Sequence, residues 1–215
     1  MEINIKLWKL VLIILKKKGI YSNLKAVFLI FNRLKKKSKM KKIIIILLIM
    51  PFIVQAQKFS KIDKSPMDQA KYPISNRVKQ KVAIITYSRP QLKGRSFSDI
   101  VPQNKVWRTG ANEATQVKFF SNIQIEETII PAGDYTIFTI IDKNEITFIL
   151  NTATHIWGAY SYDSENDVLR VKVPINQAKT SLEAFSIAFA EENGVPNICF
   201  GWEYVRFKIP FKVVD

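Results

Sequence analysis

Two apolar segments joined by a short polar turn constrain the fold of this chain most strongly. Residues 135–141 and 146–150 carry apolar side chains on both faces, and Asp142-Lys143-Asn144-Glu145 separates them. Successive side chains of a strand point to opposite faces of a sheet, so a strand that is apolar on both faces must be covered on both sides. The sequence therefore predicts a buried hairpin at the centre of packed sheets.

Further strand patterns surround this hairpin. Residues 168–173 and 205–209 alternate apolar side chains with Arg or Lys, which is typical of strands with one face in water. Residues 82–87, 116–120, 123–126 and 183–190 bring the expected total to about nine strands. We therefore expect an all-β fold, an antiparallel two-layer β-sandwich or jelly roll. A closed β-barrel is the alternative, because the sequence does not show whether the sheet edges meet.

The first 56 residues are expected to lie outside the folded domain. Residues 40–56 have a basic start, an apolar run and a small final residue, Ala56, which is the layout of a secretory signal peptide cleaved after Ala56. A retained membrane anchor is the alternative, although the run is short for a bilayer core about 30 Å thick. Residues 1–39 precede a second start-like Met40, and we interpret them as a mis-assigned N-terminal extension. A basic segment lying on a membrane surface is the alternative for them.

The rest of the chain divides into an extended arm, residues 57–76, and a single β domain, residues 77–215. The formal net charge of the whole chain is +15, and residues 1–42 carry +12 of it. The domain is therefore only weakly basic, and the electrostatic argument for a nucleic-acid partner loses its support. We expect an exported protein, periplasmic or extracellular, that meets the membrane only through its uncleaved signal.

The residue inventory excludes several kinds of chemistry. His155 is the only histidine and Cys199 the only cysteine, so one chain cannot build a zinc site from several such ligands. The sequence has no Gly-x-Ser-x-Gly nucleophile turn and no glycine-rich phosphate-binding loop. We therefore expect neither a metal nor a cofactor.

The segment Lys105–Thr115 contains more large and charged side chains than an ordinary connection between strands. One interpretation is structural: Arg108 and Glu113 form a buried pair, and Trp107 fills the core. The other is a binding site, because a guanidinium beside an aromatic ring can bind a carboxylate or phosphate. The candidate ligand-binding residues are Trp107, Arg108, Asn112, Glu113, Arg89, Arg95 and Trp157.

Several short motifs carry a resemblance to a known family. They are Tyr87-Ser88-Arg89-Pro90, Lys93-Gly94-Arg95, Val101-Pro102, Lys105 through Thr115, Pro131-Ala132-Gly133 with Tyr135, Phe138 and Thr139, Trp157-Gly158, and Asp167-Val168-Leu169-Arg170-Val171. From Ser65 to the C-terminus the chain resembles the bacterial domain of unknown function 2911. The resemblance implies an exported bacterial protein without an established activity, so it assigns no catalytic residue. Gln103-Asn104 departs from the aromatic residue and Gly that family members tend to have there.

Two functions from different classes follow from these observations. We favour a non-catalytic binding module that holds a glycan or a small anionic ligand in the cell envelope. The alternative is an exported, glycosidase-like hydrolase with Glu113 as general acid or base, and Glu203 is then the candidate for the second carboxylate. A structural envelope protein without a ligand is the third possibility.

Overall fold

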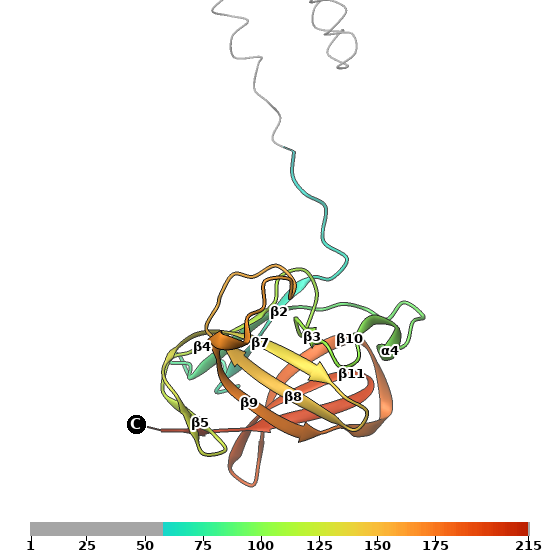
Figure 1. The fold of residues 1–215 in the computed structure, drawn as a ribbon. Coiled ribbons are helices and arrows are strands. Elements are labelled where there is room, and N and C mark those ends of the chain that lie inside the picture. The colour runs from blue at the N-terminus through green and yellow to red at the C-terminus, as the bar shows by residue number, and fades with distance from the viewer. Residues whose placement is uncertain (1–57, 215) are drawn as a thin grey trace, which may run out of the picture. The chain divides into compact units, whose positions relative to one another are not determined.

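The fold has two layers. The larger layer is an antiparallel sheet in which strands that follow one another along the chain mostly pair with one another. The computed structural model describes residues 58–214, and Lys61–Asp215 form one compact unit. The sheet order is β1 (Met67–Tyr72), β2 (Ala83–Ser88), β4 (Thr115–Phe119), β7 (Gly133–Ile141), β8 (Glu145–Asn151) and β9 (Asp167–Pro174), with β3 (Val106–Trp107) also paired with β7 (Figure 1).

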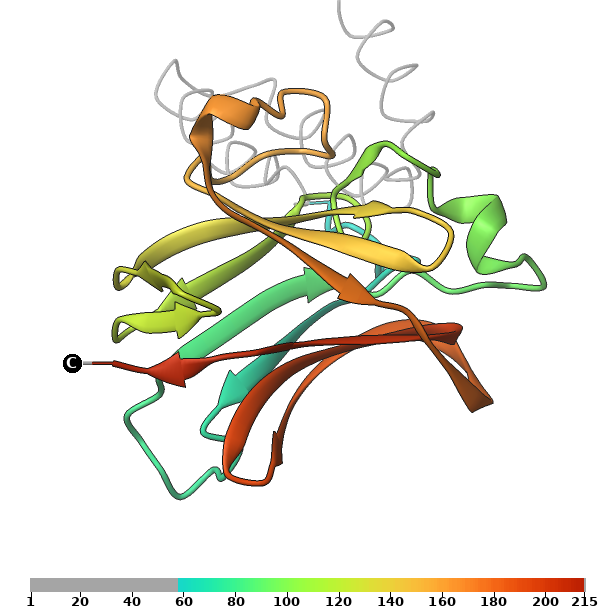
Figure 2. The same cartoon turned by 60° about the horizontal axis from the view of Figure 1, so that its bottom comes forward.

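The second layer is built around a long hairpin of β10 (Asn176–Glu192) and β11 (Val195–Pro210). Its turn is Asn193-Gly194, and both residues have positive φ, as the favoured two-residue hairpin turns require. A small sheet of β12 (Lys212–Val213), β5 (Ile123–Ile125) and β6 (Thr128–Ile130) lies beside it. Figure 2 shows the red β11 lying across from the yellow β7 and β8.

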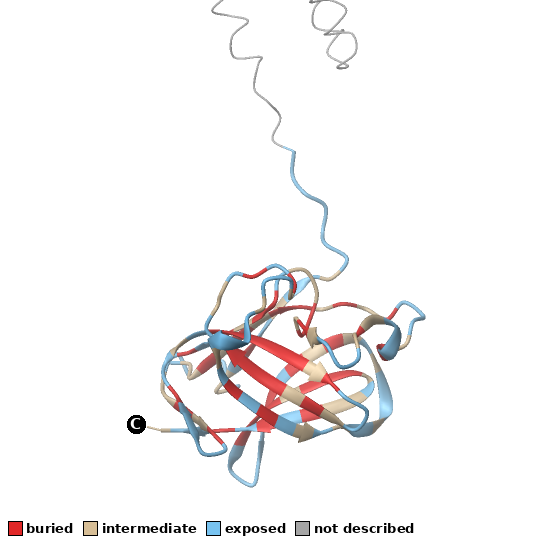
Figure 3. Cartoon of the chain, in the orientation of Figure 1, coloured by how far each residue is buried: buried red, intermediate tan, exposed pale blue. Residues whose placement is uncertain are grey.

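The main core fills the space between the layers. Apolar side chains of the larger sheet meet those of β10 and β11, and Phe148 on β8 packs against Phe200 on β11 with ring centroids 6.0 Å apart. The central strands β7 and β8 are buried along most of their length (Figure 3). Their other face has its own small core of Ala114, Phe138, Ile149 and Ile156. The hairpin expected at residues 135–150 is therefore confirmed, with both faces covered.

The expected all-β sandwich is also confirmed. Within residues 58–214 no sheet closes on itself, so the closed-barrel alternative is not observed. The described residues form twelve strands, more than the sequence patterns predicted, and the short α4 helix (Phe97–Ile100) is an addition. Strand β1 falls inside the segment expected to be an extended arm, residues 57–76, and it pairs along its whole length with β2.

The expectations for residues 1–39 and for the signal peptide at 40–56 lie outside the described residues. In the part of the chain that is described, no helix has the length and apolar character needed to cross a membrane.

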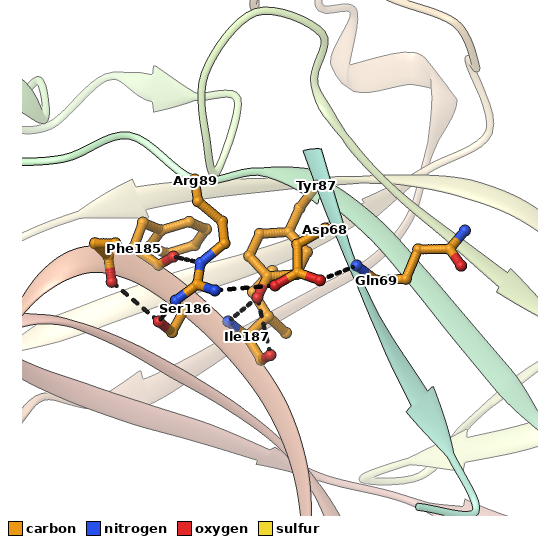
Figure 4. A network of polar contacts seen from close by, with 8 residues as sticks. Asp68, Gln69, Tyr87, Arg89, Phe185, Ser186 and Ile187 are labelled. Atoms are coloured by element: carbon orange, nitrogen blue, oxygen red, sulfur yellow. Dashed lines mark hydrogen bonds and ion pairs between the residues drawn. The ribbon is translucent and has the colours of Figure 1, made fainter. Parts of the chain in front are cut away.

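Arg89, directly after the end of β2, links the larger sheet to the hairpin of β10 and β11. Its Nε donates to the carbonyl oxygen of Phe185 at 3.0 Å, and its Nη2 donates to the Ser186 hydroxyl at 2.8 Å. Its Nη1 forms an ion pair with Asp68 on β1 at 3.0 Å (Figure 4). All three nitrogens of the guanidinium thus bind groups of the protein, and Arg89 connects three strands.

Tyr87, two residues earlier on β2, makes a second tie to the same part of β10. Its hydroxyl donates to the carbonyl oxygen of Ile187 at 3.1 Å and accepts from the Ile187 N–H at 3.0 Å (Figure 4). The side chain is buried, and this burial raises the pKa of the Tyr87 hydroxyl. The two backbone groups of Ile187 are therefore satisfied by a side chain of the other layer.

We predict that Arg89→Met lowers the free energy of unfolding by about 2 kcal/mol, because hydrogen bonds to a charged group are lost and partly buried acceptors are left without a donor. Urea unfolding of the purified protein measures this. Arg95→Met is the control, since Arg95 is exposed and bonds only to nearby carbonyl oxygens; we expect a change within about 0.5 kcal/mol. Equal effects of the two substitutions would contradict the structural role of Arg89.

Candidate functional site

Residues 108–114 form a loop that joins β3 to β4, and both of these strands pair with β7. Trp107 pairs with Thr139 of β7, and Thr115 pairs with Ile137, so only Phe138 separates the two pairing positions. The loop is closed at its base where the Thr115 N–H donates to the Arg108 carbonyl oxygen at 3.1 Å. Both ends of this seven-residue loop are therefore fixed beside a central strand of the sheet. Binding loops are commonly found on such rigid supports.

Buried hydroxyl groups fix the base of this loop. The Thr115 hydroxyl donates to the Thr109 carbonyl oxygen at 2.6 Å, and the hydroxyls of Thr109 and Thr139 lie 3.1 Å apart. All three threonines are fully buried. Thr109 has a φ of 54°, a conformation that β-branched residues adopt rarely and at a cost in energy. The surrounding structure therefore holds the backbone beside Arg108 in a strained conformation.

Gly110 allows the loop to approach the end of β2 closely. A Cβ atom at this position would lie 3.1 Å from the Ser88 carbonyl oxygen and 3.2 Å from the Thr115 hydroxyl oxygen. Both neighbours are fixed in the sheet, so a side chain at position 110 would push the loop away from β2.

A second segment, residues 152–166, packs on the loop and covers the outer face of β7 and β8. The Ala114 N–H donates to the Ile156 carbonyl oxygen at 2.9 Å, and the Gly158 N–H donates to the Asn112 carbonyl oxygen at 3.0 Å. Glu113 and Trp157 form a bridge between the same two segments. In Figure 1 the two segments lie side by side at the top of the domain.

A polar network anchors the end of this second segment. The Tyr162 hydroxyl donates to the Asp167 carboxylate at 2.5 Å, and Arg170 Nη1 donates to the same carboxylate at 2.7 Å. Burial, together with the hydrogen bond to Asp167, raises the pKa of Tyr162 to about 12. The ring of Tyr162 packs edge-on against Phe138 with centroids 5.0 Å apart. The segment that carries Trp157 and Tyr160 is therefore fixed to the sheet at its base.

A pocket of about 310 Å³ opens between the loop, the α4 region and the second segment. Its lining residues are Pro90, Ile100, Pro102, Val106, Trp107, Arg108, Gly110, Ala111, Ala159 and Tyr160. Arg108 is the one charged residue among them, so no carboxylate of residues 58–214 lines the pocket.

The guanidinium of Arg108 has no hydrogen-bond partner within residues 58–214, and its Nε atom is buried. Its Nη1 lies 3.4 Å from the point where a Cβ of residue 158 would stand, and the Tyr160 ring lies 2.7 Å from the same point. Arg108 and Tyr160 therefore flank Gly158 at the pocket. Buried polar atoms nearly always have a partner, so an unpartnered one in this position needs an explanation.

The structure separates the seven expected site residues. Arg108 and Trp107 line the pocket, although most of the Trp107 ring lies in the main core. Asn112 instead donates to the Asp63 carboxylate at 3.2 Å, and with the Ser65 N–H this hydrogen bond lowers the pKa of Asp63. Trp157 is 59% exposed and does not line the pocket.

Glu113 is exposed and makes no ion pair with Arg108 in the described part of the chain, so the interpretation of a buried pair between them is wrong. Arg89 and Arg95, the remaining expected site residues, donate to groups of the protein itself.

Glu203, the candidate second carboxylate, has a structural contact of its own. Its Oε2 accepts from the Phe97 N–H at 2.8 Å, at the start of α4, and Glu203 has a φ of 50°. Phe97 packs edge-on against Trp107, with centroids 6.5 Å apart. Glu203 thus holds the α4 region, which supplies Ile100 to the pocket wall.

Sequence reasoning missed Ile100, Ala159 and Tyr160. They come from segments without a distinctive sequence pattern. Only the neighbouring motifs that resemble the known family pointed to these parts of the chain. No group of three or more His, Cys, Asp or Glu residues that could hold a metal ion occurs among the residues described.

We predict that Arg108→Met changes the free energy of unfolding by no more than about 0.5 kcal/mol, in contrast to Arg89→Met. Methionine keeps most of the side-chain stem and removes a guanidinium that makes no hydrogen bond to the described residues. Urea unfolding of the two variants side by side measures the difference. A loss above about 2 kcal/mol for Arg108→Met would assign the guanidinium to the stability of the fold instead.

Comparison with known proteins gives one family. The model of the family described as "Protein of unknown function (DUF2911)" matches residues 65–211, which include all elements of the larger sheet, the hairpin and the pocket. No curated protein and no solved structure matches the chain.

Proposed function

Since the chain belongs to the DUF2911 family, whose description names no activity, we propose from its own pocket that it is a non-catalytic binding module for a small anionic ligand. The observation that supports this proposal is the guanidinium of Arg108, which lines the pocket without a partner among the described residues. A guanidinium offers parallel N–H donors that match the two oxygens of a carboxylate or the oxygens of a phosphate.

Charge supports the same ligand class. A cation that is partly removed from water loses hydration, and an anion bound beside it restores both the charge balance and the hydrogen bonds. Arg89 is satisfied inside the protein by three partners, whereas Arg108 is available to a ligand. The strained backbone at Thr109 and the close approach at Gly110 fix the backbone next to Arg108 before a ligand arrives.

The hydrolase alternative receives no support from the pocket. Glycosidic cleavage requires two carboxyl groups that face each other across the scissile bond. No acidic residue of the described part of the chain lines the pocket, and the Glu203 carboxylate accepts a hydrogen bond from the Phe97 N–H at the start of α4. We therefore do not propose catalysis.

We predict that small anions raise the melting temperature of the protein and change the fluorescence of Trp107 at the pocket. At a concentration of about 100 times Kd, the expected stabilisation is about 2.7 kcal/mol, or roughly 5–10 °C for a domain of this size. A panel of monocarboxylates, dicarboxylates and phosphate monoesters is screened by thermal unfolding, and the affinity of the best class is measured by calorimetry.

Matched variants locate the binding. Arg108→Met should abolish the temperature shift, while Arg95→Met, a substitution of the same kind on the surface, should leave it unchanged. If no anion acts, or if the shift survives in Arg108→Met, the proposal fails. A structural role without a ligand would then be the remaining interpretation.

We also propose that the protein is exported, on the basis of the signal-like segment at residues 40–56. The expected mature chain begins at Gln57, because signal peptidases cleave after a small residue such as Ala56. Mass spectrometry of the protein from a bacterial envelope fraction measures the N-terminus. Ala56→Phe should block cleavage and leave a heavier product, whereas an uncleaved wild-type chain in the cytoplasm would contradict export.

A further inference from the structure

Resting on the proposed anion site, we propose that the ligand is an amphipathic monoanion, a single carboxylate joined to a small apolar body. The carboxylate binds the Arg108 guanidinium, and the apolar body packs against the uncharged side chains that form the rest of the pocket. The charge, the apolar lining and the size of the pocket support this class of ligand.

The charge of the lining favours one negative group. Arg108 supplies one positive charge, and neither Lys nor a second Arg lines the pocket among the residues that the structure describes. A diphosphate or a tricarboxylate would bring further charges into a site that offers them no partner, and uncompensated charge is costly away from water. A monocarboxylate matches the single guanidinium.

The wall favours an apolar body. Ile100, Pro102, Val106 and Trp107 contribute apolar surface to the lining of the pocket. The α4 region behind them is held by its capping box at Ser96 and Asp99, and also by the Glu203 carboxylate. Apolar side chains on fixed backbone give a preformed surface on which a ligand buries carbon atoms.

Tyr160 adds an aromatic ring to the lining of the pocket. Its ring is 85% exposed and lies beside Gly158, next to the Arg108 guanidinium. A ligand that binds Arg108 can therefore cover this ring, which would otherwise remain in water. An exposed aromatic ring beside a cation suits a molecule with one charged end and one apolar end.

The same features disfavour a sugar acid. Each hydroxyl of such a ligand would lose a hydrogen bond to water and would need a partner in the pocket. Among the lining side chains, only Arg108, the Tyr160 hydroxyl and the Trp107 indole N–H carry polar hydrogens. The volume of about 310 Å³ is also at the lower end of ligand pockets, which suits a small organic acid better than an oligosaccharide.

The test compares hexanoate with gluconate by calorimetry on the purified protein. The two ions have the same carbon chain and the same carboxylate, and gluconate carries a hydroxyl on each carbon apart from the carboxylate carbon. Hexanamide supplies the apolar chain without the charge, and inorganic phosphate supplies charge without an apolar body. We expect hexanoate to bind at least about tenfold more tightly than gluconate, whose hydroxyls would lose hydrogen bonds to water. We expect the same margin over hexanamide, which lacks the carboxylate that binds the Arg108 guanidinium.

Two exposed aromatic residues of the same segment give a matched pair of variants. Tyr160→Ser should weaken hexanoate binding several-fold, while Trp157→Ser, outside the pocket, should leave it unchanged. Both side chains are largely in water, so neither substitution should prevent folding. The reverse pattern, with Trp157 required and Tyr160 dispensable, would overturn the inference.

The outcomes separate the two proposals. If gluconate or phosphate binds as tightly as hexanoate and Arg108→Met abolishes that binding, the anion site stands and the amphipathic ligand is overturned. If none of the four probes binds, the amphipathic ligand is overturned, and the wider panel of anions decides the proposed function separately. If the Arg108→Met variant binds hexanoate as tightly as the unchanged protein, both proposals fail.

Discussion

The structure depends on the packing of Trp107 between the two layers. Its indole stacks on that of Trp202 in β11, with centroids 6.0 Å apart and planes 13° from parallel. Phe185 of β10 contacts both rings edge-on. Buried aromatic pairs of this kind contribute more than their area alone, so the cluster fixes the hairpin against the larger sheet. It also fixes where β3 ends.

The position of Arg108 follows from this packing. Side chains alternate along β3, so Val106 faces the outer core, Trp107 faces the main core, and Arg108 is directed to the outer side again. The threonine hydroxyls then hold the backbone after Arg108, with Thr109 strained. A backbone fixed in this way places the base of the Arg108 side chain at the pocket, and such preorganisation lowers the cost of binding a ligand.

Much of the fold could be predicted from residue patterns. The hairpin of β7 and β8 was evident because residues apolar on both faces need cover on both sides. Strand β1 was missed because Met67–Tyr72 lies at the sheet edge with mostly exposed or half-exposed side chains, and its pairing depends on β2 rather than on its own sequence. The Asn193-Gly194 turn carries a local signal for a hairpin, and it could have shown that β10 and β11 continue to that point.

The candidate site could be predicted only in part, because two arginines with similar neighbours in sequence have opposite roles. Arg89 stands two residues after Tyr87 and Arg108 directly after Trp107, so both arginines were predicted to bind a ligand. The sheet register brings Asp68, Phe185 and Ser186 to Arg89, and these partners lie far from it along the chain. No such group reaches the guanidinium of Arg108 within the described residues. A guanidinium that makes no hydrogen bond to the described residues keeps its donors for a ligand, which favours a binding role for Arg108 over a purely structural one.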